Sequence, residues 1–148
     1  MPNPLYTFDD LQTLERFQPK IVDGVFTFDE SILNLEFIDL SNKKELDKIL
    51  FKSPQPNLRY LDASRCSIRS IIIPAGCEKL EMIYLHSNQI TEITIEGDCP
   101  KLELLDLSEN KLTQLKMPFE YKSLGNLFLR NNNLTNLTNL SRFFTHDD

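Results

Sequence analysis

The chain has 148 residues, of which 26% are charged, and a formal net charge of −6. This length can form one domain with a sizeable core, and the acidic balance argues against a general nucleic-acid binder, which normally carries a basic stripe. No apolar run is long enough for a transmembrane helix, and residues 1–6 lack the basic and apolar regions of a secretory signal. We therefore expect no nucleic-acid or membrane partner, and a cytoplasmic location.

The N-terminal stretch carries the signals of a short helix. Residues 7–17 have Thr7 as a candidate N-cap and place Leu11 and Leu14 on one apolar face. Pro19 would end this helix, because proline lacks the backbone N–H that a helix interior needs.

A hairpin signal follows in residues 21–28. Asp23-Gly24 lies between β-forming residues, which is typical of a two-residue hairpin turn. Alternatively, Phe26 and Phe28 belong to a further, degenerate strand of the repeat that begins at residue 35.

From residue 35 onward the chain repeats one apolar pattern. Residues 102–112 have the spacing L-x-x-L-x-L-x-x-N-x-L, in which Leu105 and Leu107 predict a short strand with one buried face. Most units follow at steps of 22 residues, and the first, less regular unit precedes the second by 23 residues. One such strand buries too little apolar surface to be stable alone, so the units must stack. They begin at Leu35, Leu58, Leu80, Leu102 and Leu124.

The period, the strand and the Asn position together resemble the leucine-rich repeat family over residues 35–140. The resemblance implies a right-handed α/β solenoid of about five repeats with a parallel sheet on its concave side. The short period is similar to that of the bacterial internalin-like subclass, which implies a mostly non-helical convex side. We expect residues 1–34 to form an N-terminal cap and residues 141–148 a C-terminal cap or tail, because a solenoid must cover the open ends of its core.

Two kinds of convex segment are predicted. In residues 42–52, the helical spacing of Leu46, Ile49 and Leu50 predicts the one regular convex helix. In the next three units, apolar residues two apart predict short extended segments instead. These pairs are Ile71 and Ile73, Ile93 and Ile95, and Leu115 and Met117.

Repeated polar and sulfur-containing residues are expected to be structural. Asn88, Asn110 and Asn132 predict an internal ladder whose side-chain amides satisfy backbone groups, and Cys66 takes the same place in another unit. Elsewhere two further cysteines stand 22 residues apart, so they occupy one position in adjacent units, where the strand spacing does not exclude a disulfide. We interpret them as buried thiols of a cytosolic protein. They are Cys77 and Cys99.

The C-terminal end offers only a thin cover for the core. Leu140, Phe143 and Phe144 are expected to fold over the open end. Either this cap suffices, or the natural chain continues, or a partner covers the end.

Residues between the strand leucines are expected to point outward onto the concave face, with equivalent positions about 5 Å apart. Many of them are apolar or aromatic, which favours a protein-binding patch. The alternative is that the N-terminal cap or a flanking segment covers them. The predicted partner-binding residues are Phe37, Tyr60, Asp62, Met82, Tyr84, His86, Leu104, Asp106, Phe128 and Arg130.

Polar residues on this face do not predict an enzyme. The aspartates of the strands favour a solvated polar surface, and the alternative is an acidic strip that pairs with a basic partner. His86 lies near serines and aspartates, but an open strand surface offers neither an oxyanion hole nor a pocket. One histidine there is too few for a metal site. We expect no catalytic residue, no cofactor and no metal.

The sequence therefore predicts a non-catalytic protein–protein interaction module, monomeric alone, that binds an unidentified protein partner on its concave face. A rigid sheet would lose little ordering entropy on binding. The family resemblance also allows an alternative: a substrate-targeting module, or a fragment of a larger protein such as a bacterial effector delivered into host cells.

Overall fold

In the computed structural model, residues 17–143 are described, and the helix predicted over residues 7–17 lies outside this range except for Phe17. Five three-residue strands pair side by side in parallel, in the order β2-β4-β6-β8-β9. In each strand the central residue is buried, because alternate side chains of a strand point to opposite faces. The strands are β2 Phe37–Asp39, β4 Tyr60–Asp62, β6 Met82–Tyr84, β8 Leu104–Asp106 and β9 Asn126–Phe128.

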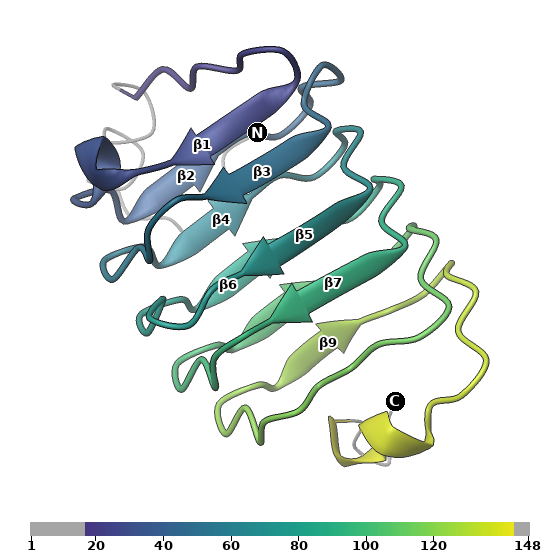
Figure 1. Ribbon diagram of the computed structural model, residues 1–148. Coiled ribbons are helices and arrows are strands. Elements are labelled where there is room, and N and C mark those ends of the chain that lie inside the picture. The colour runs from purple at the N-terminus through teal and green to yellow at the C-terminus, as the bar shows by residue number, and fades with distance from the viewer. Residues whose placement is uncertain (1–16, 144–148) are drawn as a thin grey trace.

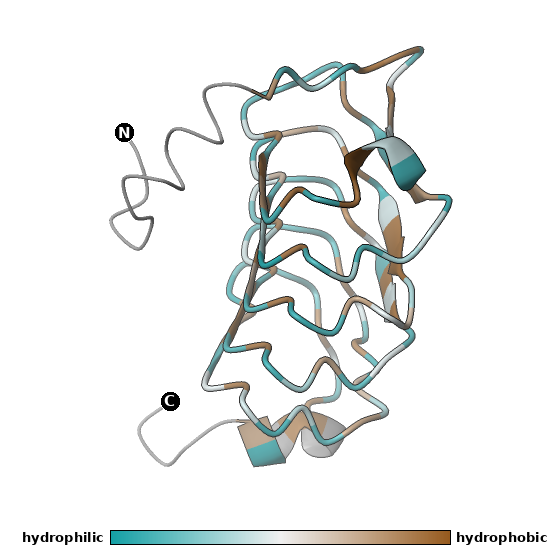
Figure 2. Cartoon of the chain, turned by 90° about the vertical axis from the view of Figure 1, so that its left-hand side faces the viewer, coloured by the Kyte–Doolittle hydropathy of each residue, from teal (hydrophilic) through white to brown (hydrophobic). Residues whose placement is uncertain are grey.

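Four further strands form a second layer, the convex side (Figure 1). β1 pairs in parallel with β3, and β5 pairs in parallel with β7. The chain passes alternately through the two layers, so the molecule is a solenoid of parallel strands whose core lies between them, and Figure 2 shows the turns stacked one on another. We call each turn a coil and name the outward side of the five-stranded sheet the concave face. The second-layer strands are β1 Val25–Phe28, β3 Lys48–Phe51, β5 Ser70–Ile73 and β7 Glu92–Ile95.

The convex helix predicted in residues 42–52 is wrong, because β3 occupies its second half. Leu46 and Ile49 are buried, which a helix and an extended segment would both allow. Leu50, however, is 37% exposed, and Phe51 packs on the core instead. Leu46, Ile49 and Phe51 stand 22 residues before Ile68, Ile71 and Ile73, so this coil repeats the extended pattern of the next one. Pairing with β1 then supplies the backbone hydrogen bonds that a helix would have made internally.

The extended segments predicted for the following coils are confirmed at two places. Ile71 and Ile73 lie in β5, and Ile93 and Ile95 lie in β7. Leu115 and Met117 are buried at the equivalent positions although no strand forms there.

The predicted hairpin is correct in its turn and wrong in its pairing. Asp23 and Gly24 both have positive φ, 51° and 81°, and Val22 and Val25 exchange two backbone hydrogen bonds of 2.9 Å across them. No strand continues this antiparallel contact, since β1 pairs with β3 instead. β1 carries two buried phenylalanines, which agrees with the alternative of a further repeat strand, placed on the convex side. The phenylalanines are Phe26 and Phe28.

The predicted asparagine ladder is present and connects successive coils. Asn110 Nδ2 donates to Leu107 O of its own coil and to Leu85 O of the preceding coil, both at 3.0 Å, while its Oδ1 accepts from Ile90 N at 2.9 Å. Asn88 and Asn132 repeat this arrangement. In the second coil, the Cys66 thiol donates to Leu40 O at 3.1 Å but has no amide oxygen to accept a backbone N–H.

The three cysteines are free and buried. Burial raises the pKa of the Cys99 thiol from 9.0 to about 11, and the neighbouring Cys77 acts in the same direction. One coil further on, burial raises the pKa of the Tyr121 phenol from 10.0 to about 12. Both groups therefore keep their protons in the folded chain at pH values where the unfolded chain would release them.

The C-terminal end of the core is covered by η2, Thr138–Phe143. Leu140 and Phe143 are buried as predicted, whereas Phe144 lies outside the described residues. The Arg142 guanidinium stacks on Phe143 at 4.2 Å from the ring centroid and donates to Phe119 O at 2.9 Å, which ties η2 to the preceding coil. The exact division into caps and repeats stays a prediction. Within residues 17–143, no helix is long and apolar enough to cross a membrane.

Replacing Asn110 by Ala should strongly destabilise the solenoid. The change leaves two carbonyls and one N–H without their buried partner, and each such group costs about 1–3 kcal/mol. We expect the free energy of unfolding in urea to fall by at least about 2 kcal/mol. Asn133→Ala is the matched control at an exposed position and should change stability by less than about 0.5 kcal/mol. Equal effects of the two substitutions would contradict the ladder.

The free energy of unfolding should fall as the pH rises above 9. Between the unfolded and folded pKa values of Cys99, unfolding releases a proton, so higher pH favours the unfolded chain by up to about 1.4 kcal/mol per pH unit for this group. Tyr121 adds the same trend from pH 10. Urea unfolding of wild type and Cys99→Ala below pH 9 and near pH 11 measures the two slopes. Identical slopes would show that the Cys99 thiol does not contribute to the pH dependence of the free energy of unfolding.

Candidate partner-binding face

Strand register brings the predicted concave rows together. Phe37, Tyr60, Met82, Leu104 and Asn126 are successive partners in the five-stranded sheet. The middle row is formed in the same way by Asp39, Asp62, Tyr84, Asp106 and Phe128. Residues that stand 22 or 23 apart in the sequence thus lie side by side on one face.

The first row is less open than its outward position predicts. Phe37 and Tyr60 are only 3% and 6% exposed, and their ring centroids are 4.8 Å apart. The Arg59 guanidinium lies over both rings and is held by ion pairs to Glu81, at 2.6 Å, and Glu36, at 3.5 Å. These two rings are therefore packed, whereas Met82 and Leu104 further along the row are half-buried.

The aspartates of the middle row have a local structural role. Asp62 Oδ1 accepts from the Ser64 N–H at 3.0 Å and from its hydroxyl at 2.7 Å. Asp39 makes the same two bonds with Ser41, and Asp106 accepts from the Ser108 N–H. An Asp-x-Ser pair of this kind closes the turn at the end of a strand. The acidic side chains thus support the turns of three coils.

Two coils depart from this Asp-x-Ser pattern. The third coil has Tyr84 and His86 at these places, and the fifth has Phe128 and Arg130. In both coils, an aromatic residue and a histidine or arginine replace the Asp-x-Ser pair that closes the turn elsewhere. Phe128 is 43% exposed, so its ring is open to contact. The departures mark side chains that the scaffold does not require.

Three of these residues, His86, Phe128 and Arg130, line a hollow of about 360 Å³ on the concave face, here called the concave hollow. It brings together four predicted partner-binding residues, His86, Asp106, Phe128 and Arg130. The other six predicted residues lie on the same face outside its lining. The residues lining the hollow are Arg65, His86, Ser87, Asp106, Ser108, Glu109, Phe128 and Arg130.

Four lining residues were not predicted as partner-binding residues: Arg65, Ser87, Ser108 and Glu109. Ser108 belongs to the third concave row, which consists of Ser41, Ser64, His86, Ser108 and Arg130. Arg65, Ser87 and Glu109 occupy the position that follows this row, where the backbone has positive φ in all five coils. The same place holds Asn42 and Asn131 in the first and last coils. A sharp turn at each strand end aims this side chain toward the rim of the face. Extending the rows by one residue would have found them in the sequence.

The concave hollow does not assemble a catalytic group among the described residues. His86 Nδ1 lies 3.2 Å from Ser87 Oγ, while the Ser64 hydroxyl and the Ser108 N–H are engaged with aspartates. The Ser87 hydroxyl donates to Glu109 Oε2 at 2.7 Å, so its proton is not directed at the His86 ring, whereas acyl transfer requires a nucleophile that donates to the histidine. Within residues 17–143, no group of three or more His, Cys, Asp or Glu side chains gathers in the way that a metal ion requires.

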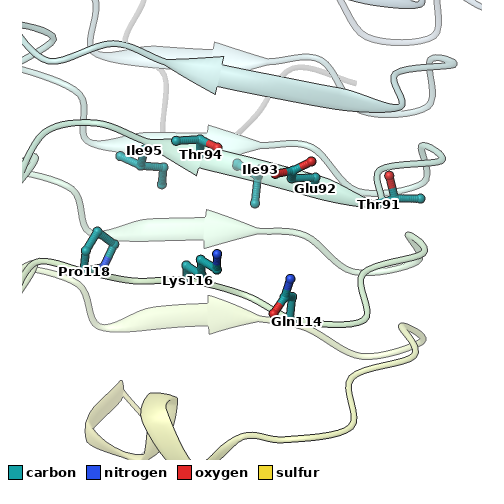
Figure 3. A pocket seen from close by; sticks show the side chains of 8 residues that line it. All are labelled: Thr91, Glu92, Ile93, Thr94, Ile95, Gln114, Lys116 and Pro118. Carbon is teal, nitrogen blue, oxygen red and sulfur yellow. The ribbon is translucent and has the colours of Figure 1, made fainter.

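A second hollow, of about 430 Å³, lies on the convex side (Figure 3). It runs between β7 and the segment of residues 114–118, which does not pair with β7. Glu92 and Thr94 line it from the strand, and Gln114 and Lys116 line it from the unpaired segment. It contains none of the predicted partner-binding residues and provides a comparison site on the same molecule.

Comparison with known proteins identifies the repeat. A family model described as Leucine Rich repeats (2 copies) matches residues 56–97 and 78–117. Residues 56–117 therefore carry leucine-rich repeats, and the described residues fold as a leucine-rich-repeat solenoid. The similarity to the internalin-like subclass stays a prediction. Leucine-rich repeats generally serve as protein–protein interaction modules and are typically not enzymes.

One curated relative is a "Roc-COR-CHAT protease" from Runella zeae. It is 39% identical to the chain over 57 residues, which is 38% of this chain and 6% of the relative. The match thus spans only a small part of that much longer relative.

Asp62 should tolerate Asn better than Ala. Burial raises the pKa of the Asp62 carboxyl, so its charge is disfavoured in the folded chain, while its oxygen is needed by Ser64. Asn keeps an oxygen acceptor without the charge and should leave the urea midpoint unchanged or higher. Ala leaves the Ser64 N–H unpaired and should cost about 1 kcal/mol. A larger loss with Asn than with Ala would contradict this role.

Proposed function

We propose that the chain binds a protein partner on its concave face and that the concave hollow is the centre of the contact. Aromatic and arginine side chains dominate the energetics of protein interfaces, and the fifth coil presents one of each, Phe128 and Arg130. The exposed Phe128 ring, at a place where three other coils have an aspartate, is the observation that carries this proposal.

The scaffold behind the hollow supports the proposal. The lining residues come from four successive coils, whose backbones are joined by parallel pairing and by the asparagine ladder. The backbone that presents them is ordered before a partner arrives, so little backbone entropy would be lost on binding. Tyr84 adds a half-buried aromatic surface from the neighbouring row, and Met82 and Leu104 continue it. The packed rings of Phe37 and Tyr60 continue the same row toward the first coil.

The test compares two double variants, one on each side of the solenoid. Phe128→Ala with Arg130→Ala removes two exposed groups of the concave hollow, and Thr94→Ala with Lys116→Ala alters the convex hollow. Quantitative mass spectrometry of proteins captured from a lysate of the source organism should show a specific partner with wild type. We expect capture to fall about tenfold or more with the concave variant and to be unchanged with the convex one.

Two measurements keep the comparison interpretable. The urea midpoints of both variants should stay close to that of wild type, because the substituted side chains are exposed. Size-exclusion chromatography should show a monomer for every form, as we expect for the chain alone. Capture that survives the concave substitutions and is lost with the convex ones would move the site to the back of the solenoid.

A second candidate is that the repeats act as the targeting part of a larger protein. The local similarity to a very long protease relative favours this candidate. If it is correct, proteins captured by the chain should overlap with those cleaved by the Runella zeae protease. Two unrelated sets of proteins would argue against a shared targeting role. A cytoplasmic location and delivery into a host cell stay predictions.

A further inference from the structure

We propose that the concave hollow receives an acidic side chain, Asp or Glu, of the protein partner, with a neighbouring apolar side chain of the partner packed on Phe128. This inference rests on the proposed function and names the chemistry of the segment that the face selects. It departs from the expectation raised by the net charge of −6, which would favour a basic partner.

The first step concerns the hydrogen-bond donors of the hollow. Arg65 and Arg130 line it from the second and fifth coils, and both side chains are exposed. Within residues 17–143, Arg59 forms both ion pairs of the chain, and neither guanidinium in the hollow takes part in one. Each guanidinium carries five N–H donors in a planar arrangement that matches the two oxygens of a carboxylate.

The second step concerns the acidic groups. Asp106 Oδ1 accepts from the Ser108 N–H at 3.0 Å, and Glu109 Oε2 accepts from the Ser87 hydroxyl at 2.7 Å. Both carboxylates thus have donors from their own surroundings, whereas neither guanidinium has an acceptor among residues 17–143. The open hydrogen-bonding capacity of the hollow is therefore mainly donor capacity, and an incoming carboxylate uses it best.

The third step concerns why the ligand is a protein segment and not a polyanion such as a nucleic acid. The two arginines are balanced by the charges of Asp106 and Glu109, so the hollow attracts one carboxylate at close range without drawing in an extended line of phosphates. Phe128 adjoins the same hollow and is 43% exposed, so it offers an apolar contact beside the charged one. A segment with an acidic residue next to an apolar residue satisfies both contacts.

The test selects binders from a random-peptide phage library on the immobilised full chain. We expect enrichment of peptides in which Asp or Glu stands beside a large apolar residue. A synthetic selected peptide should bind about tenfold or more weakly to Arg65→Gln/Arg130→Gln and to Phe128→Ala. Replacing its acidic residue by the amide should weaken binding to wild type but have little further effect on the arginine variant, because the two changes remove the same contact.

The outcomes separate this inference from the proposed function. Enrichment of basic or uncharged peptides that still need Phe128 would overturn the acidic chemistry and leave the concave face as the site. Acidic peptides whose binding ignores both arginines would also overturn it. Peptides that bind only where Thr94 and Lys116 are intact would overturn both proposals, and failure to enrich any peptide would count against the acidic contact.

Discussion

Each asparagine of the ladder binds two coils at once, and the rest of the solenoid depends on this interaction. The amide of Asn110 donates to Leu107 O in its own coil and to Leu85 O in the preceding one, while its oxygen accepts the Ile90 N–H. Every coil makes a sharp turn out of its strand, and such a turn leaves buried backbone groups that must find partners. One side chain supplies three of them, so each coil is completed by its neighbour.

Because the ladder and the apolar rows hold the backbone, the outward positions can vary. Three coils use them for an Asp-x-Ser pair that closes the turn, as in Asp62 with Ser64. The third and fifth coils have an aromatic residue and a histidine or arginine there, and the fold remains the same. The proposed binding surface therefore lies where the outward side chains do not close the turn.

Much of the scaffold was predictable because it repeats. The 22-residue period predicts the five-stranded sheet and the ladder, and the register Tyr60, Met82, Leu104 follows directly. The strand β3 was mistaken for a helix because Leu46, Ile49 and Leu50 have helical spacing, and only alignment with the next coil shows the extended pattern. The burial of Phe37 and Tyr60 was expected only under the alternative of a covered face, because an outward direction does not determine what packs on a side chain. The concave hollow depends on turns that the apolar pattern does not describe.

The left-handed turn at the end of each concave strand has a consequence for how this surface can diversify. Five coils place a residue with positive φ there, and none of the five is glycine. Glycine would adopt this backbone without strain, whereas other residues cost about 1 kcal/mol or more. A non-glycine residue at each turn therefore lowers the stability of the fold slightly. It also places chemically different side chains in one row, from Arg65 to Glu109. Substitutions along that row change what the rim presents and leave the core untouched, so related chains can acquire new recognition properties there while keeping the same coil.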